Sequence, residues 1–288
     1  MKQDAFSRCH PAVNFLYFVG AIGFGVVIQH PVYMLAAVLG SLLYYGLLKG
    51  KKAVKTLLLL IPLFLLITLV NPLFNTLGKT ELFLLFGRPY TLEALYYGAV
   101  VGGIFIVMML WFGCYSEVLT SDKFTSLFGS FIPSISLLLV MVLRMIPNLM
   151  GKAAQISGVR KSIGKSADNG TMKEKVRSGM TVLSALTDWA LEGSIVTADS
   201  MRSRGYGSAK RTNFQIYRMT LRDWVLLVLI AALAAATIFG GDKSAEFIPA
   251  VQIMPLTWGF TAYCAYLLLP TALHLKEALT WHILRSRI

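Results

Sequence analysis

The stretch Leu92–Phe112, "LEALYYGAVVGGIFIVMMLWF", decides the structural class of this protein. Apart from Glu93 near its start, the stretch contains no acidic or basic residue. An α-helix needs about 20 consecutive, mostly apolar residues to cross the hydrocarbon core of a bilayer. Leu92–Phe112 is therefore predicted to be a transmembrane helix.

Outward from this stretch, five more runs lack charged residues. They are Pro11–Ile28, Val32–Leu48, Leu57–Val70, Trp224–Phe239 and Ala250–Leu269. The composition agrees, because 56% of the 288 residues are hydrophobic and only 14% are charged, whereas soluble domains carry roughly 25% charged residues. The chain is predicted to be an all-α integral membrane protein with about six transmembrane helices and a cytoplasmic domain of long crossed helices.

The distribution of lysine and arginine predicts the orientation, since cytoplasmic loops are enriched in both. With the N-terminus inside, only Lys79, Arg88 and Lys243 of the 27 basic residues lie outside. Both termini are therefore expected in the cytoplasm. One further stretch, Phe124–Leu143, is also charge-free and long enough to cross. A crossing there would export the basic block that follows, and Gly129 and Pro133 interrupt the helix, so we expect this stretch to lie in the interface or against protein.

These spans divide the chain into four parts. Residues 1–114 form an N-terminal membrane domain with an outer hairpin loop at about 73–91, where Gly87–Pro89 is a turn sequence. Residues 115–221 form a cytoplasmic domain, 222–270 the C-terminal membrane helices, and 271–288 a cytoplasmic tail. Whether residues 124–143 and 250–269 cross the membrane stays open at this point.

No cluster of residues predicts a metal site or a disulfide. Cys9, Cys114 and Cys264 are far apart in the sequence and form no paired motif. The four histidines are also scattered, so interfacial or structural roles are expected for them. The first apolar run is followed by Gln29–Pro31 rather than by a small-residue cleavage site, and no cleavable signal peptide is expected.

Two helices are predicted in the cytoplasmic block, at Ile135–Met150 and Val176–Gly205. Small residues along the second allow another helix backbone to approach closely. It ends in Arg204 and Gly205, and the earlier basic stretch includes Arg160. Glycine after a helix and arginine in its last turn are ordinary capping chemistry. A guanidinium at a helix tip also suits a carboxylate or carbonyl cluster on a partner.

The stretches "LRMIPNLMGKAAQISGVRKSIG" (143–164) and "LEGSIVTADSMRSRGYGSAKRT" (191–212) resemble the T component of energy-coupling factor (ECF) transporters, the EcfT/CbiQ type. Arg144 and Pro147 match the family's Arg-x-x-Pro element. Ser203-Arg204-Gly205 matches its second Ala-Arg-Gly tripeptide, with serine in place of alanine. The first tripeptide departs from the pattern, because Lys161 follows Arg160 where glycine is expected.

The resemblance implies a non-catalytic subunit of a multi-pass importer in the plasma membrane of a prokaryote. Two cytoplasmic ABC ATPases would bind at Arg160, Ser203, Arg204 and Gly205. A membrane substrate-binding S component would deliver a vitamin or a transition-metal ion such as cobalt. A possible S-component surface consists of Leu137, Leu138, Met141, Met145 and Met150. The resemblance implies ATP and Mg²⁺ on the partner ATPases, no cofactor bound by this chain and no nucleic-acid partner.

Two alternatives remain beside this reading. An ion-coupled permease needs ionisable groups inside the membrane, and the six spans have none away from their ends. A membrane-embedded enzyme needs a nucleophile and base within reach of one another, and Asp188, Glu192 and Asp199 have no histidine nearby. The stretch "GVRKSIGKS" (158–166) is one residue too long for a phosphate-binding loop, so ATP hydrolysis is expected in another chain.

Overall fold

The computed structural model describes most of the chain. The described residues are 5–75, 80–85, 88–129, 133–164, 171–208, 217–241, 245–246, 252–253 and 257–285. They form two compact units, which we call the membrane unit (Met1–Phe124 and Tyr217–Ile288) and the coupling unit (Thr125–Ile216). Each unit is described by itself.

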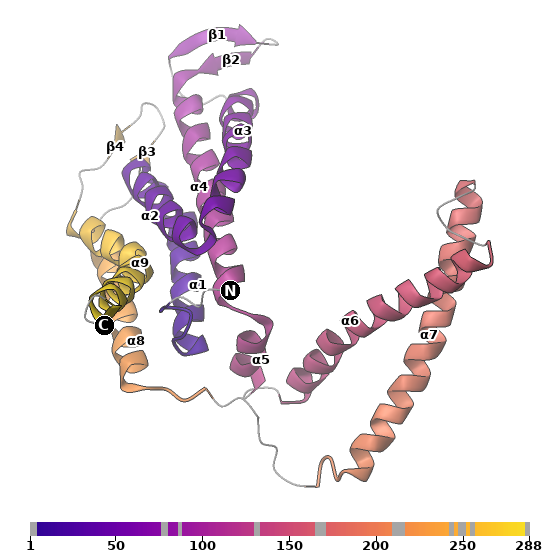
Figure 1. Cartoon of the computed structure of the whole chain (residues 1–288). Helices are drawn as coiled ribbons and strands as arrows, with labels where there is room; N and C mark the ends of the chain where they lie inside the picture. The colour runs from indigo at the N-terminus through magenta and orange to yellow at the C-terminus, as the bar shows by residue number, and fades with distance from the viewer. Residues whose placement is uncertain are drawn as a thin grey trace. The chain divides into compact units, whose positions relative to one another are not determined.

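The membrane unit is a helical bundle, drawn in Figure 1. Its helices are α1 (Pro11–Val27), α2 (Pro31–Lys49), α3 (Lys51–Phe74), α4 (Leu92–Val118), α8 (Leu221–Phe239) and α9 (Trp258–Arg285). The short helix α5 (Ser121–Gly129) follows α4. Strands in the described residues are confined to two short hairpins, so the all-α membrane fold is confirmed.

Five helices in the described residues are long and apolar enough to cross a membrane. They are α2, α3, α4, α8 and the segment Leu137–Ser162 of the coupling unit. Helix α1 is apolar but shorter, with 17 residues. The predicted helix at Leu92–Phe112 is confirmed and continues to Val118.

Two His-Pro pairs fix where α1 and α2 begin. His10 and His30 occupy the N-cap positions, and in each case the following proline is the first helical residue. The Nδ1 atom of His10 accepts a hydrogen bond from the N–H of Ala12 at 3.2 Å, and that of His30 accepts from Val32 at 3.3 Å. Proline suits this position because its missing N–H would have no helical partner. Both histidines thus have the structural role that their scatter predicts.

Aromatic side chains fill the centre of the bundle. Tyr17 of α1 and Tyr266 of α9 stack with ring centroids 5.1 Å apart, and Trp111 of α4 lies edge-on to Tyr17. The Tyr266 hydroxyl donates to the carbonyl of Tyr17 at 2.8 Å, and the Tyr17 hydroxyl donates to the carbonyl of Leu267 at 3.2 Å. These reciprocal bonds fix α1 against α9, since buried polar groups are costly when unpaired.

The last helix begins later than the sequence predicts. The predicted span starts at Ala250, whereas Gln252–Ile253 form strand β4, paired with β3 (Ala245–Glu246), and α9 starts at Trp258. The start of α9 lies against the end of α8, where a Cβ on Gly240 would fall 2.3 Å from the Cα of Gly259. This backbone contact sets the position at which α9 begins. The hydropathy of the sequence does not predict such a contact.

The loop between α3 and α4 contains a β-hairpin. Strands β1 (Glu81–Leu85) and β2 (Arg88–Thr91) pair antiparallel, with Leu85 opposite Arg88. Gly87 of the predicted turn lies outside the described residues. The Tyr90 hydroxyl donates to the carbonyl of Leu69 at 3.2 Å, which ties the hairpin to α3.

The coupling unit contains two long helices, α6 (Pro133–Ser162) and α7 (Met172–Ser203). Figure 1 shows them meeting near the chain reversal between them and diverging away from it. The break predicted within Phe124–Leu143 coincides with helix ends, because Gly129 is the last residue of α5 and Pro133 is the first of α6. Glu174 accepts a hydrogen bond from the N–H of Thr171 at 2.8 Å and so closes the N-terminus of α7.

Candidate functional site

The C-terminal end of α7 is closed by a Schellman motif. Gly205 has a positive φ of 72°, and its N–H donates to the carbonyl of Arg202 at 3.0 Å. The N–H of Tyr206 donates to the carbonyl of Met201, also at 3.0 Å. Glycine is favoured here because a side chain is strained at positive φ. Gly205 therefore has a conformational role, as its place after the helix indicates.

This end of α7 presents cationic side chains to the surroundings. Arg202, Ser203 and Arg204 are all exposed. The Ser203 hydroxyl donates to the carbonyl of Asp199 at 2.8 Å, so it is occupied within its own helix. Arg204 is the last residue before the positive-φ glycine, and the rigid turn fixes its backbone. A guanidinium held there is available to an acidic or carbonyl-rich partner.

Arg160 lies in a different environment from Arg204. Its Nη2 atom donates to the hydroxyl of Ser178 on α7 at 3.1 Å, and Ser178 is buried. The glycine that closes α6 is Gly164, with φ of 74°, and its N–H donates to the carbonyl of Lys161. Arg160 therefore precedes its closing glycine by four residues, whereas Arg204 is adjacent to its own. The two arginines do not occupy equivalent places at their helix ends.

A second contact joins the same two helices. The Lys152 ammonium lies 5.8 Å from the centre of the Trp189 ring, a cation–π arrangement. Together with the Arg160–Ser178 bond, it places the antiparallel contact of α6 and α7 near the chain reversal. The bond to Ser178 places Arg160 beside that position of α7. Between Ser178 and Arg204, α7 rises about 1.5 Å per residue. Roughly 40 Å of helix therefore separates Arg204 from the level of Arg160.

The apolar residues of α6 form a partly covered stripe. Leu137, Met141 and Met145 recur at helical spacing and are half-buried, whereas Leu138 and Met150 are 63% and 68% exposed. Arg144 is exposed on the same helix, and Pro147 lies inside the helix. Exposed apolar side chains on this scale favour contact with lipid or another protein.

Three acidic residues of α7 have no basic partner among the residues that the structure describes. Asp188, Glu192 and Asp199 are exposed, and none forms a salt bridge with a described residue. No group of three or more metal-ligating side chains occurs among the described residues. Lys165 and Ser166, the last two residues of the stretch that resembles a phosphate-binding loop, fall outside the described residues.

Sequence reasoning missed two residues of the helix contact. Ser178 was not distinguished from the other small residues of α7, and Lys152 had no predicted partner. Both contacts depend on the angle and register of two helices that are separate in sequence, so no local pattern predicts them.

The comparisons with known proteins agree with one another. The chain is 33% identical over 100 residues to the energy-coupling factor transporter transmembrane protein EcfT of Streptococcus thermophilus, covering 34% of this chain and 38% of the relative. It is 27% identical over 182 residues to EcfT of Staphylococcus aureus, covering 59% of this chain and 68% of the relative. EcfT of Streptococcus equi subsp. equi is 29% identical over 100 residues, which cover 34% of this chain and 37% of the relative.

No family model matches the chain. The alignments span less than two fifths of the two streptococcal relatives and about two thirds of the staphylococcal one. All three relatives carry the same name, and that name is the one indicated by the coupling-helix motifs. The resemblance is thereby confirmed, and the chain is similar to the transmembrane proteins EcfT of energy-coupling factor transporters.

Proposed function

We propose that this chain is the coupling subunit of an ECF-type importer. Two cytoplasmic ABC ATPases bind the coupling unit, and a separate S component binds the substrate within the membrane. The motion that ATP drives in the ATPases passes through α6 and α7 to the S component. The transported substrate is a vitamin or a transition-metal ion, and both chain termini face the cytoplasm.

The exposed end of α7 is the observation that carries this proposal. A Schellman motif fixes Gly205, and Arg204 projects from the residue before it. Arginine in that place complements the negative end of the helix dipole. It also keeps its five donors available for a partner, since no described side chain pairs with it. Charge-assisted hydrogen bonds to a partner carboxylate contribute about 1.5–3 kcal/mol.

The separation of the two arginines supports two docking points. Arg160 lies beside Ser178 of α7, and about 40 Å of helix separates Ser178 from Arg204. This distance is too large for both arginines to enter one groove. On this proposal Arg204 enters one ATPase directly. Arg160 acts near the second docking point and also holds α6 against α7 through Ser178.

The exposed apolar side chains of α6 support the S-component contact. Leu138 and Met150 are largely exposed, and the half-buried Met141 and Met145 lie between them in sequence. Methionine adapts to differently shaped partners because its side chain is flexible and polarisable. This suits a surface that must accept a hydrophobic membrane protein.

An ion-coupled permease is the alternative. It requires ionisable groups in the middle of the membrane helices. Among the described residues of the membrane unit, the buried acidic side chains are Glu93 and Asp223, and both lie in the first turn of a helix. Positions at helix ends do not form an ion pathway, so the coupling function is favoured.

Co-purification with the ATPases tests the proposal. The chain, the ATPases and a tagged S component would be expressed together and purified in detergent. We expect Arg204→Ala to weaken ATPase retention by about tenfold to a hundredfold, because each 1.4 kcal/mol is a factor of ten. Arg222→Ala is the matched control, since Arg222 is an exposed arginine outside the coupling unit. Equal retention by Arg204→Ala and Arg222→Ala would contradict docking at Arg204.

A further inference from the structure

The segment before α1 is well packed against the membrane unit. In Ala5–His10, Phe6 is fully buried, and Ala5 and Cys9 are 2% and 5% exposed. The Phe6 ring lies edge-on to Tyr17, Phe18 and Tyr44, with centroids 5.1–6.4 Å apart. Terminal segments are ordinarily loose unless something ties them down. We call Ala5–His10 the N-terminal clamp.

The clamp holds the connection that leads into the coupling unit. Lys123 lies two residues before Thr125, where that unit begins. Its ammonium donates hydrogen bonds to the carbonyl of Ser7 in the clamp and, at 3.0 Å, to the carbonyl of Val118 at the end of α4. Burial lowers the pKa of this ammonium. Lysine is seldom placed in such a half-buried position unless its donors are satisfied.

The clamp also holds the connection that leads out of the coupling unit. The N–H of His10 donates to Oδ1 of Asp223 at 3.0 Å. The other carboxylate oxygen accepts from the N–H of Thr220 at 3.0 Å and from its hydroxyl at 2.7 Å. Tyr217, the first residue after the coupling unit, lies edge-on to the His10 ring at 6.5 Å. One carboxylate thus joins the start of α8 to the clamp.

Each of the two connections contacts the clamp, one through Lys123 and the other through Asp223 and Tyr217. Burial and, secondarily, the negative charge of Asp122 raise the pKa of the Tyr217 hydroxyl. Asp122 belongs to the incoming connection and Tyr217 to the outgoing one. Both connections are therefore fastened to one six-residue segment of the membrane unit, which is itself anchored in the aromatic core through Phe6.

We propose that the N-terminal clamp fixes both connections of the coupling unit to the membrane bundle, so that displacement of the coupling helices is transmitted to the bundle instead of being lost in slack connections. The transmitted motion rests on the proposed function. The positioning role is carried by the Lys123–Ser7 and His10–Asp223 bonds alone. Lys123 and Asp223 are positioning residues in this scheme and touch no substrate.

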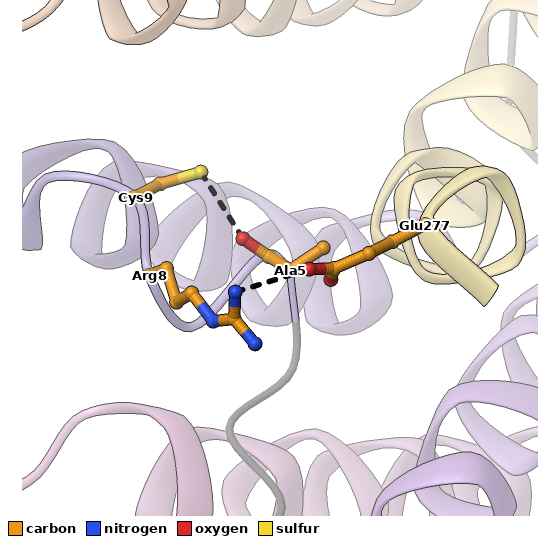
Figure 2. A network of polar contacts seen from close by, with 4 residues as sticks. All are labelled: Ala5, Arg8, Cys9 and Glu277. Atoms are coloured by element: carbon orange, nitrogen blue, oxygen red, sulfur yellow. Dashed lines mark hydrogen bonds and ion pairs between the residues drawn. The ribbon is translucent and has the colours of Figure 1, made fainter. Parts of the chain in front are cut away.

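The chain itself offers a matched control. Arg8 of the clamp pairs with Glu277 of α9 at 3.1 Å, and Figure 2 shows this pair beside the contact between Cys9 and the carbonyl of Ala5. The Arg8 side chain is 55% exposed, and Glu277 belongs to neither connection. We expect Arg8→Ala to disturb the clamp without releasing the coupling unit.

The test measures the distance between the two connections. Spin labels would be placed at the exposed positions Thr120 and Arg218. The full-length chain would keep the buried Cys9 and Cys114, carry alanine in place of Cys264, and be studied in lipid nanodiscs with the ATPases bound. We expect a narrow distance distribution in the unmodified clamp and in Arg8→Ala. Lys123→Met and Asp223→Ala should each widen it at least twofold, and Lys123→Arg should restore the narrow distribution.

Unchanged widths in both Lys123→Met and Asp223→Ala would overturn the clamp. Thr220→Ala separates the clamp from helix capping, because it removes a donor to Asp223 but leaves the bond from His10. Equal widening by Thr220→Ala and Asp223→Ala would therefore also contradict it. If the ATPases did not bind the unmodified chain, the proposed function would fail. The same distance measurement on the chain alone would still decide the positioning role.

Discussion

The contact between Gly20 and Tyr266 offers a sharp test of the bundle. A Cβ added to Gly20 would fall 2.2 Å from the Tyr266 hydroxyl oxygen and 3.1 Å from the carbon that carries it. Gly20→Ala would therefore push this hydroxyl away from the carbonyl of Tyr17, to which it donates at 2.8 Å. The substitution acts on α9 although it lies on α1.

The magnitude follows from three contributions. Overpacking a well-filled core costs about 1–3 kcal/mol, and the lost hydrogen bond costs a further 0.5–1.5 kcal/mol or so. Alanine offsets about 1 kcal/mol of this through its higher helix propensity. The expected net loss is about 2 kcal/mol, or about 4 °C in Tm for a chain of this length.

Thermal unfolding in detergent can be followed with a thiol-reactive dye, because Cys9 and Cys114 are buried. Cys264 is partly accessible and would be replaced by alanine. Gly23→Ala is the matched control, since a Cβ on Gly23 would meet no atom within 4 Å. It should leave Tm unchanged or raise it slightly.

A double substitution isolates the hydroxyl as the cause. Tyr266→Phe alone should cost about 1 kcal/mol, because one hydrogen bond is lost. Gly20→Ala combined with Tyr266→Phe should cost less than the sum of the two, since the clashing atom is gone. Strict additivity, or equal Tm values for Gly20→Ala and Gly23→Ala, would refute the reasoning.

Three further predictions concern other contacts. Gly240→Ala should lower Tm by more than Gly20→Ala does, because its Cβ would meet the backbone of Gly259, which cannot rotate away. The same thermal assay would check this prediction. Gly46→Ala is the control, since a Cβ there meets nothing within 4 Å. Glu117→Gln should lower Tm by less than about 2 °C, since its 2.9 Å ion pair with Lys49 is about one third exposed and such pairs contribute about 0–1 kcal/mol; a larger loss would contradict this. Arg160→Met should widen the spin-label distance distribution between α6 and α7, because the bond to Ser178 is lost, whereas Arg144→Met, an exposed change on the same helix, should not.

The membrane helices follow largely from the sequence. Charge-free runs of sufficient length predict α2, α4 and α8 closely, because a helix in lipid must satisfy its own backbone hydrogen bonds and stay apolar outside. Gly129 and Pro133 mark helix ends by local backbone chemistry, and they lie at the end of α5 and the start of α6. The motif around Gly205 predicts the end of α7 for the same reason.

The site could be predicted only in part. The exposed Arg204 beside a positive-φ glycine follows from the order of residues along one helix. The Arg160–Ser178 bond does not, because it depends on which faces of α6 and α7 meet. The contacts of Lys123 could not be predicted from the sequence either. Its acceptors are backbone carbonyls, and any residue type can supply a carbonyl.

The sequence by itself determined the class of the protein, most of its helices and the chemistry of its helix ends. Each of these depends on interactions within a few residues, or on the transfer of side chains from water to lipid. Only the tertiary structure decided that α9 begins at Trp258 against Gly240, and that one N-terminal segment fastens both connections of the coupling unit. These depend on contacts between residues more than a hundred positions apart, or on backbone atoms without a sequence signature.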